Sequence, residues 1–546
     1  MRIRSTLLLV AAAVAHAGDA APAAPPELKA QIDAYLKPLV EMGVFSGAVL
    51  VARDGRVVEA AYGKADFEAG TPNELSTRFK LMSVSKSITA VAVMRLVQAG
   101  KLELEDPVGK HLRAWPEAWR DVTVHQLLDH TSGIRNLEQE WAAAARESGE
   151  RGLRVWEQLA PKLAGRPLDM AAGSRKAYSN FNYVVLGLIL EAVAGRPYAA
   201  VLHTEVLGPA GMERTGIDDG ERRQGLSVGY FRGKEGAPAS SVQDMSMILG
   251  AGGFYSTVGD LYRLDRALRA DALLRAETRK RMLTSTRAGG GYACGWIVSQ
   301  VQGRTCVHHS GGANGYVADL LRFPDDDACV VVLSNFAFAP AGRISQDLAG
   351  LLFGNGAKPA RKVARATLDG WAGIYRPVDE AGRVMLIRRS GDVLLCFDAR
   401  KGVERCGGDL LLPVADDVFA LPWGGEDLSF TAAADGRPAR VRCGPTEMER
   451  AEPPLDAWRA AAGAYAVDPD GPTQIVEKDG RVNLLMKESW PPEQEILPLT
   501  ESLGLALYTE EFGTLFHLER DDRGRVLGFQ RQRNDGKDVQ GVRKGD

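Results

Sequence analysis

The sequence has no excess of charge of either sign, because 67 lysines and arginines nearly balance 70 aspartates and glutamates. Proteins that bind nucleic acid or an acidic membrane surface through charge carry a basic face, and this composition supports neither class. Beyond the first residues, the sequence also lacks an apolar stretch long enough to cross a bilayer. We therefore expect no nucleic-acid partner and no stable membrane insertion, and the oligomeric state is left open.

Cysteine is scarce, with six residues in the whole chain, which is too few for a disulfide-based scaffold. There is no Cys-x-x-Cys pair and no Cys/His spacing typical of zinc, so we expect no metal ion and no cofactor. Cys396 and Cys406 flank a predicted hairpin centred near Arg400 and Lys401, so they could face each other. A bridge in an oxidising compartment and two buried thiols are both consistent with this spacing.

The N-terminus has the pattern of a secretory signal peptide. Arg2 and Arg4 precede a short apolar run at residues 7–15, and Ala15 and Ala17 then give a small-x-small cleavage site. This pattern predicts a signal peptide over residues 1–17 and a periplasmic or secreted mature protein. A first helix of the fold is the alternative.

The length of the chain indicates several domains. Residues 28–357 alternate helical and strand-like segments, and short strands and turns follow from about 366. This C-terminal part repeats itself, since Leu368-Asp369-Gly370-Trp371 corresponds to Leu455-Asp456-Ala457-Trp458. The repeat predicts two small antiparallel β-barrel domains at 366–453 and 455–546, with one larger β domain as the alternative.

Within the first region, residues 83–99 contain no glycine or proline and are apolar on most faces. They predict a buried helix that ends at Gly100. Strand-like runs stand at both sequence ends of the region, at 45–52, 57–62, 292–299, 305–309, 317–323 and 329–334. Helices packed on an antiparallel sheet of this kind form an α+β domain.

The buried helix begins with Ser83 and Lys86, three positions apart and hence on one helix face. A serine hydroxyl needs a base beside it to attack a carbonyl, and burial next to a helix N-terminus disfavours a charged lysine. A neutral amine can accept the serine proton, while N–H groups at the helix start can bind an oxyanion. Alone, this spacing also occurs by chance.

Two further elements strengthen this prediction. Tyr178 and Asn180 stand two positions apart, just before an apolar helix. Tyrosine can shuttle protons, and asparagine can donate a hydrogen bond to a substrate carbonyl. The alternative is that Ser179 or Asn180 only caps the helix, which is a common role for these residues. Residues 308–312, His-His-Ser-Gly-Gly, lead a strand into a glycine-rich turn where the backbone can approach a ligand. The two histidines make no metal site, because neighbouring strand residues point to opposite faces.

Taken in order, these motifs resemble those of the penicillin-recognising serine hydrolases, which include class C β-lactamases, D-Ala-D-Ala carboxypeptidases, D-aminopeptidases and lactamase-like esterases. The resemblance covers residues 30–340 and includes the stretches 122–133 and 252–257. It implies a β-lactamase/transpeptidase-like catalytic domain. It also implies these roles: Ser83 as acylated nucleophile, Lys86 as its activator, Tyr178 as proton shuttle, His309 as a further catalytic position, Asn180, Ser310, Gly311 and Gly312 as substrate-binding residues, and the N–H groups of Ser83 and Gly312 as oxyanion hole.

At the third motif, His309 stands where many β-lactamases and carboxypeptidases have a lysine. A histidine is mostly neutral near pH 7, so selection for a substrate carboxylate or for penicillins is not expected. Two C-terminal barrels resemble the architecture of bacterial D-aminopeptidases, in which a loop of the last barrel selects a free amine. The corresponding segment here is 487–495, for which an ordinary surface hairpin is the alternative.

The sequence thus predicts a serine hydrolase that acts through an acyl-enzyme on short peptides or amides, with D-aminopeptidase-like activity. A carboxylesterase or acyltransferase on the same scaffold is one alternative. A non-catalytic binding or sensing module is another, although binding alone needs no activated serine.

Overall fold

The computed structural model describes the chain from residue 26 to residue 543 with gaps. The gaps are 219–222, 232–247, 314, 378–382, 401–404, 408, 422–426, 433–437, 453–462, 468–470, 479–480, 487–492, 499–502, 508–511, 522, 524–525 and 533–537. The predicted signal peptide, residues 1–17, lies outside the described residues.

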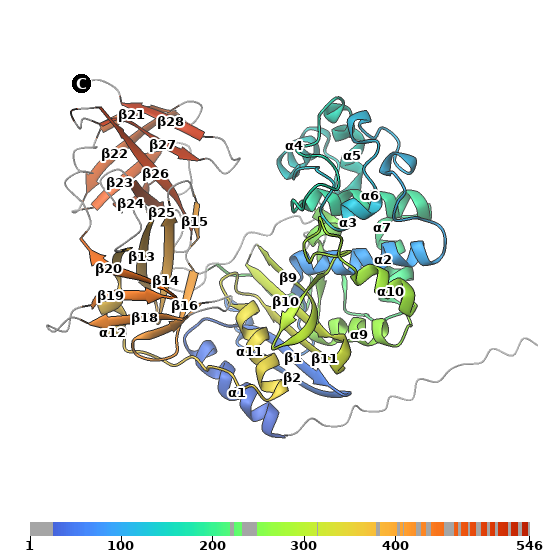
Figure 1. Ribbon diagram of the computed structural model, residues 1–546, viewed down its shortest axis with the longest axis horizontal. Coiled ribbons are helices and arrows are strands. Elements are labelled where there is room, and N and C mark those ends of the chain that lie inside the picture. Colours follow the sequence, from blue (N-terminus) through green and yellow to red (C-terminus); the bar gives the residue numbers. More distant parts are fainter. Residues whose placement is uncertain are drawn as a thin grey trace, which may run out of the picture.

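A six-stranded antiparallel sheet in the order β2-β1-β11-β10-β9-β8 forms the centre of the first region (Figure 1). Its strands are β1 (Gly47–Arg53), β2 (Arg56–Tyr62), β8 (Ile297–Val301), β9 (Arg304–Ala313), β10 (Tyr316–Phe323) and β11 (Ala328–Ser334). Strands from both sequence ends pair directly, with Gly47 opposite Ser334. The predicted α+β arrangement is therefore confirmed, although β8 begins at Ile297 and not at Tyr292.

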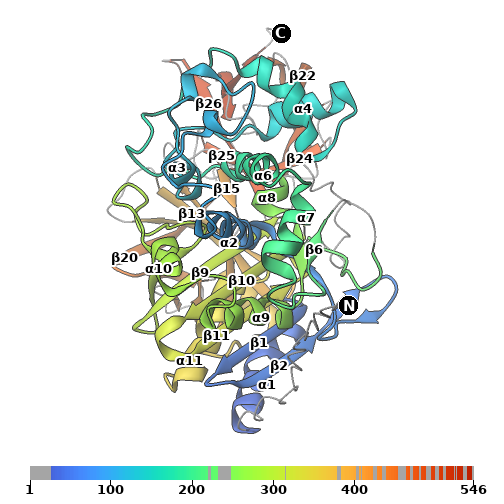
Figure 2. The ribbon, with the colours of Figure 1, turned by 90° about the vertical axis from the view of Figure 1, so that its right-hand side faces the viewer.

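Each face of this sheet is covered by helices. Ala48, Leu50 and Ala52 of β1 join the core below α2 (Ser85–Gln98), α6 (Asn180–Ala194) and α9 (Val258–Arg269). Val49 and Val51 belong to the core cluster on the opposite face, with α1 (Pro26–Glu41) and α11 (Ala341–Phe353). This alternation is what a two-sided β-strand produces. Figure 2 views the sheet from the side on which α2 and α9 lie in front of it.

The helices beside the sheet end where the sequence provides caps. The chain enters α2 through a 3-10 turn, η1 (Met82–Val84). Just beyond the end of α2, Gly100 has a φ of 67°, a left-handed conformation that glycine adopts easily because it has no Cβ. Gly195 ends α6 in the same way with a φ of 65°. The other elements of this region are β3 (Lys64–Asp66), β4 (Thr71–Pro72), β5 (Phe79–Lys80), α3 (Val124–Leu128), α4 (Glu138–Ser148), α5 (Trp156–Leu159), α7 (Tyr198–Leu202), β6 (Gly216–Ile217), α8 (Leu249–Gly252), β7 (Phe254–Ser256) and α10 (Ala276–Leu283).

Among the described residues, no single helix has the length and apolar composition needed to cross a membrane. The bent pair formed by Asn180–Ala194 and Tyr198–Leu207 meets these criteria jointly. Its first helix, α6, is mostly buried in the core cluster of the first region.

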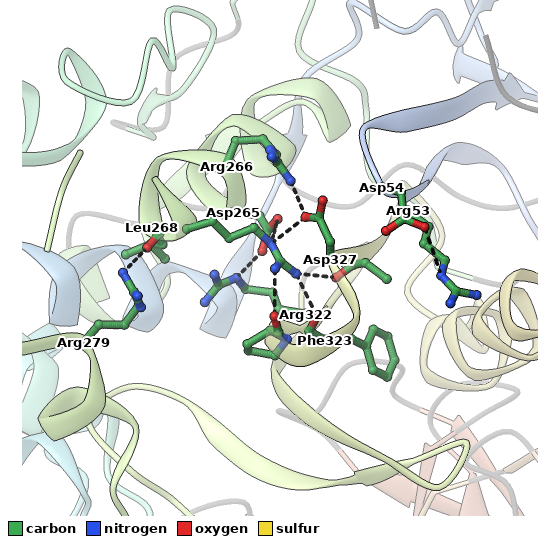
Figure 3. A network of polar contacts seen from close by, with 12 residues as sticks. Arg53, Asp54, Asp265, Arg266, Leu268, Arg279, Arg322, Phe323 and Asp327 are labelled. Atoms are coloured by element: carbon green, nitrogen blue, oxygen red, sulfur yellow. Dashed lines mark hydrogen bonds and ion pairs between the residues drawn. The ribbon is translucent and has the colours of Figure 1, made fainter. Parts of the chain in front are cut away.

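A buried charge network fastens α9 to the turn between β10 and β11 (Figure 3). Arg322 Nε donates to Asp265 Oδ1 at 2.8 Å, and both side chains are 1% exposed. Arg269 bonds the other oxygen of Asp265 at 3.0 Å and also donates to the carbonyl oxygen of Phe323. Arg266 pairs with Asp327 at the same turn. The Asp265–Arg322 pair is therefore removed from water, so the loss of either partner would leave an uncompensated buried charge, whereas Arg266 and Asp327 remain partly exposed.

The first C-terminal unit is a closed antiparallel barrel in the order β12-β13-β14-β16-β17-β18-β19-β20. These strands are β12 (Gly373–Pro377), β13 (Arg383–Ser390), β14 (Val393–Arg400), β16 (Asp409–Pro413), β17 (Val418–Ala420), β18 (Leu428–Ala432), β19 (Pro438–Cys443) and β20 (Thr446–Ala451), preceded by α12 (Arg365–Trp371). Residues 358–362, which lead into this unit, contact the barrel, since Arg361 N–H donates to the carbonyl oxygen of Pro413 at 2.8 Å.

The second C-terminal unit follows the same strand plan, as the sequence repeat predicts. It contains β21 (Gly463–Val467), β22 (Gly471–Lys478), β23 (Arg481–Met486), β24 (Glu493–Pro498), β25 (Leu503–Leu507), β26 (Phe512–Arg520), β27 (Val526–Gln532) and β28 (Asp538–Arg543). Neighbouring strands pair along this series, β21 pairs with β28, and so the described strands form a continuous ring.

One strand crosses between the two C-terminal units. β15 (Arg405–Gly407) follows β14 in sequence, but it pairs with β26, with Arg405 opposite Thr514. β14 instead pairs with β16, which places Asp409 opposite Cys396. The prediction that one hairpin brings Cys396 and Cys406 face to face is therefore wrong, because Cys406 leaves that hairpin for the other sheet.

Candidate active site

Ser83 lies in η1, where the chain enters α2. The preceding residue, Met82, is buried and has a φ of 48°, a left-handed conformation that costs energy for a residue with a side chain. Strand β9 passes so close that a Cβ added to Gly311 would lie 2.3 Å from the carbonyl oxygen of Leu81 and 2.8 Å from the nitrogen of Ser83. Glycine at 311 therefore lets β9 reach the serine backbone.

Lys86 lies one helical turn beyond Ser83, and its side chain is fully buried. Its Nζ is 3.0 Å from Ser83 Oγ and 2.7 Å from both Asn180 Oδ1 and the carbonyl oxygen of Ala251. Burial lowers the pKa of Lys86 well below its usual 10.5, and the charge of Glu138 opposes this shift. A neutral amine gives its two N–H groups to the two carbonyl oxygens, so its lone pair faces the serine hydroxyl.

Tyr178 completes the environment of the serine oxygen. Its hydroxyl donates to Ser83 Oγ at 2.8 Å, and its ring centroid lies 4.8 Å from Lys86 Nζ. The residue as a whole is 44% exposed, but the desolvation of its phenol raises the pKa of Tyr178 to about 12, while the hydrogen bond to Ser83 lowers it. The phenol is therefore protonated at neutral pH, so it can donate to Ser83 Oγ while the serine hydroxyl donates to Lys86.

Asn180 is the first residue of α6, and its amide is oriented from two sides. Its Oδ1 accepts from Lys86, and its Nδ2 donates to Glu138 Oε1 at 2.5 Å. The backbone N–H of Asn180 donates to Asn136 Oδ1 at 2.5 Å. Glu138 begins α4 and is exposed, so a carboxylate with free acceptor capacity lies beside the lysine and asparagine.

The third predicted motif occupies β9, which carries His309, Ser310, Gly311 and Gly312 past the serine. His309 is only 3% exposed; its Nε2 is 2.8 Å from Tyr292 Oη and its Nδ1 is 2.6 Å from the carbonyl oxygen of Ser310. Burial lowers the pKa of His309 to about 3. Ser310 and Gly312 are exposed on the strand. The backbone of this motif therefore lies beside the serine. The His309 ring instead packs on Tyr292 and makes no described contact with the serine.

The family of the chain follows from comparison with known proteins. Residues 32–354 match the family model described as Beta-lactamase. The chain belongs to the β-lactamase family. The matched range contains the sheet, the helices around it, and all eight predicted site residues, so this member of the family is a serine hydrolase, as the sequence motifs predict.

The relatives include penicillin-binding proteins and an esterase. Penicillin-binding protein 4* of Bacillus subtilis (strain 168) is 30% identical over 54% of this chain and 69% of its own length. Esterase EstB of Burkholderia gladioli is 32% identical over 48% of this chain and 76% of its own length. The octameric penicillin-binding protein homologue from Pyrococcus abyssi has a TM-score of 0.54 at 23% identity, over 85% of this chain and 98% of that chain. This last likeness shows the fold alone.

Sequence reasoning missed several residues that surround the site of this β-lactamase family member. Ala251 directly precedes the family-like stretch 252–257, and His130 lies within the family-like stretch 122–133, so the resemblance marks both places but predicts neither contact. Asn136, Glu138 and Tyr292 carry no local signal. No cluster of three or more metal-ligating side chains occurs in the described parts of the chain.

Proposed function

We propose that the chain hydrolyses short peptides or amides through an acyl-enzyme on Ser83, with D-aminopeptidase-like activity. The observation that carries this proposal is the position of Ser83 Oγ, which is 3.0 Å from a buried lysine amine and 2.8 Å from a phenol hydroxyl. A protein that only binds a ligand has no need to bury an uncharged lysine, which costs desolvation energy, beside a serine.

In the proposed mechanism, Lys86 takes the proton of Ser83 as its oxygen attacks the substrate carbonyl. The N–H groups of Ser83 and Gly312 bind the oxyanion of the tetrahedral intermediate. Tyr178 gives its proton to the leaving nitrogen and is reprotonated from Lys86, so the amine departs neutral and an ester on Ser83 remains. Water then attacks this ester with Tyr178 as proton carrier and restores the serine.

Two features support a substrate with an amine near the reacting carbonyl. Glu138 offers an exposed carboxylate 2.5 Å from the amide of Asn180, where it can pair with an ammonium group. His309 stays neutral, so it offers no fixed cation for a substrate carboxylate. The barrel loop predicted to select the amine, 487–495, lies outside the described residues up to 492, and the proposal does not depend on it.

Carboxylesterase or acyltransferase activity is the second candidate. The relative named esterase EstB supports it, since it is 32% identical over most of its own length. A neutral third-motif histidine fits an uncharged ester as well as it fits an amide.

A labelling experiment tests the reaction class. A fluorophosphonate is incubated with the wild type and with Ser83→Ala, and each product is weighed by intact mass. We expect one adduct on the wild type and none on the variant. The absence of an adduct on the wild type would remove the hydrolase proposal.

A substrate comparison tests the specificity. We expect hydrolysis of D-alanine p-nitroanilide, and expect Glu138→Gln to reduce this activity more than hydrolysis of p-nitrophenyl butyrate, which has no amine. Equal effects on both substrates would exclude the proposed ammonium contact. Substitutions within 487–495 are preferable to deletion after 453 for testing the barrel loop, because deletion removes the partner strand of β15.

We also propose export with cleavage after Ala17 and the division 28–357, 366–453 and 455–546. The intact mass of the mature protein tests the first, and limited proteolysis with mass mapping of the fragments tests the second.

A further inference from the structure

His130 lies directly behind the proton shuttle, although it does not contact Ser83. It follows α3 in the fold, is completely buried, and has a φ of 61°. Non-glycine residues adopt this left-handed region at a cost in energy, and such strain is retained where the surrounding structure depends on it.

His130 contacts the chain on both sides of Tyr178. Its carbonyl oxygen accepts the N–H of Ala177 at 2.8 Å, and its Nδ1 accepts the N–H of Ser179 at 3.2 Å. Between these two bonds, the imidazole lies against the Tyr178 ring with a centroid distance of 4.3 Å. One residue thus binds the backbone N–H groups of Ala177 and Ser179, the neighbours of Tyr178 in sequence, and packs on the face of the Tyr178 ring.

The hydrogen bonds define the protonation form of this histidine. Nδ1 accepts from a backbone N–H, so the ring proton belongs on Nε2. Nε2 is buried and has no hydrogen-bond partner among the described residues. The centroids of the Tyr292 and Tyr183 rings lie 4.7 and 5.3 Å from the centroid of the His130 ring. Burial lowers the pKa of His130 well below 6.5. A protonated ring would direct a second donor at the Ser179 N–H.

We propose that His130 is a positioning residue for Tyr178: its carbonyl oxygen and its Nδ1 hold the N–H groups of Ala177 and Ser179, one on each side of Tyr178, and thereby place the phenol hydroxyl against Ser83 Oγ. This inference rests on the proposed function, because it assigns a role to His130 only through a reactive Tyr178. It also explains why the family-like stretch 122–133 places a strained residue behind the site.

Two substitutions separate the acceptor from the ring. His130→Phe keeps an aromatic ring but removes Nδ1, which leaves the buried N–H of Ser179 without an acceptor. His130→Asn keeps an acceptor at the same distance from the backbone and tolerates the left-handed conformation. His308→Phe is the matched control, since His308 is a half-buried histidine of β9 that bonds Ser299.

For p-nitrophenyl butyrate, we expect His130→Phe to lower kcat by about 10- to 100-fold with KM changed less than about twofold, because a small displacement of a reacting group has this effect. His130→Asn recovers most of the lost kcat, and His308→Phe stays near the wild type. In a Tyr178→Phe background, His130→Phe has almost no further effect, because both changes act on the same group.

Losses that multiply in the double variant would overturn the inference, as would a His130→Phe enzyme with wild-type kcat. A measurement on the wild type covers the case in which His130→Phe fails to fold: ¹⁵N NMR of labelled histidine is expected to show the neutral Nε2–H form, and an Nδ1–H or charged form refutes the inference. Failure of fluorophosphonate to label wild-type Ser83 is a separate result, since it refutes the proposed function itself.

Discussion

Replacement of Lys86 by methionine removes the amine from the site but keeps most of the side-chain volume. The amine contacts Ser83 Oγ at 3.0 Å and two carbonyl oxygens at 2.7 Å, so the change removes a base and leaves two acceptors unpaired. A positioned general base contributes about 10²- to 10⁴-fold to a rate, which corresponds to about 3–5 kcal/mol in the barrier. We expect acylation by a fluorophosphonate to slow by a factor in this range.

The same variant has a characteristic pH dependence of stability. The pKa of Lys86 is far below 10.5 in the folded protein, whereas the unfolded chain has the ordinary value. Between these two pKa values, the unfolded chain binds one more proton, so this group makes the wild type more stable as the pH rises toward 10.5. Methionine removes this contribution, and the Tm of Lys86→Met relative to the wild type should therefore fall as the pH is raised from 6 toward 10.

Both measurements use simple assays. Acylation is followed by intact mass at several times, and Tm is measured by calorimetry across the pH range. Lys101→Met, an exposed lysine just beyond α2, is the control and should change neither quantity. An acylation rate within about threefold of the wild type, far below the loss expected for a general base, would refute the reasoning, as would parallel Tm profiles of the two proteins.

Other changes test other parts of the molecule. Asp265→Asn leaves the buried Arg322 without its charged partner, so we expect a loss of about 3–5 kcal/mol in the free energy of unfolding by urea, largely recovered when Asp265→Leu is combined with Arg322→Met. His309 has a pKa of about 3, so the pH–rate profiles of the wild type and His309→Gln should have the same shape near pH 6.5. Gly311→Ala should abolish labelling by the fluorophosphonate, because its Cβ would lie 2.3 Å from the backbone beside the serine; Gly312→Ala, whose Cβ would lie 3.4 Å from its nearest neighbour, should cost less.

The sequence predicts the catalytic helix well, because local signals decide it. Residues 83–99 contain no helix breaker; the helix ends at Gln98, and the predicted terminating glycine, Gly100, follows its C-cap Ala99 in a left-handed conformation. The β-strands of the sheet are also predictable from short apolar runs. The start of β8 is not, because Gly295 adopts a φ of 76° and breaks the apolar run that begins at Tyr292.

The surroundings of the site could not be predicted in this way. Glu138 meets Asn180 from 42 positions away, and His130 meets Ser179 from 49 positions away. Such contacts depend on how α3, α4 and α6 pack, and neither the spacing nor the composition of the sequence encodes them. The motif residues themselves are recognisable because they share short stretches of chain, whereas the groups that set their pKa values and directions do not.

The pairing of β15, a segment of the first C-terminal unit, with β26 of the second unit has a consequence for biosynthesis. β15 leaves the ribosome long before β26, so it must wait with an unpaired edge until nearly the whole chain has been made. An open edge of this kind is a template for pairing with other chains, and a pairing so distant in sequence forms slowly. The last step of folding is therefore expected to be the closure of this contact, and chains that terminate early should be prone to aggregate.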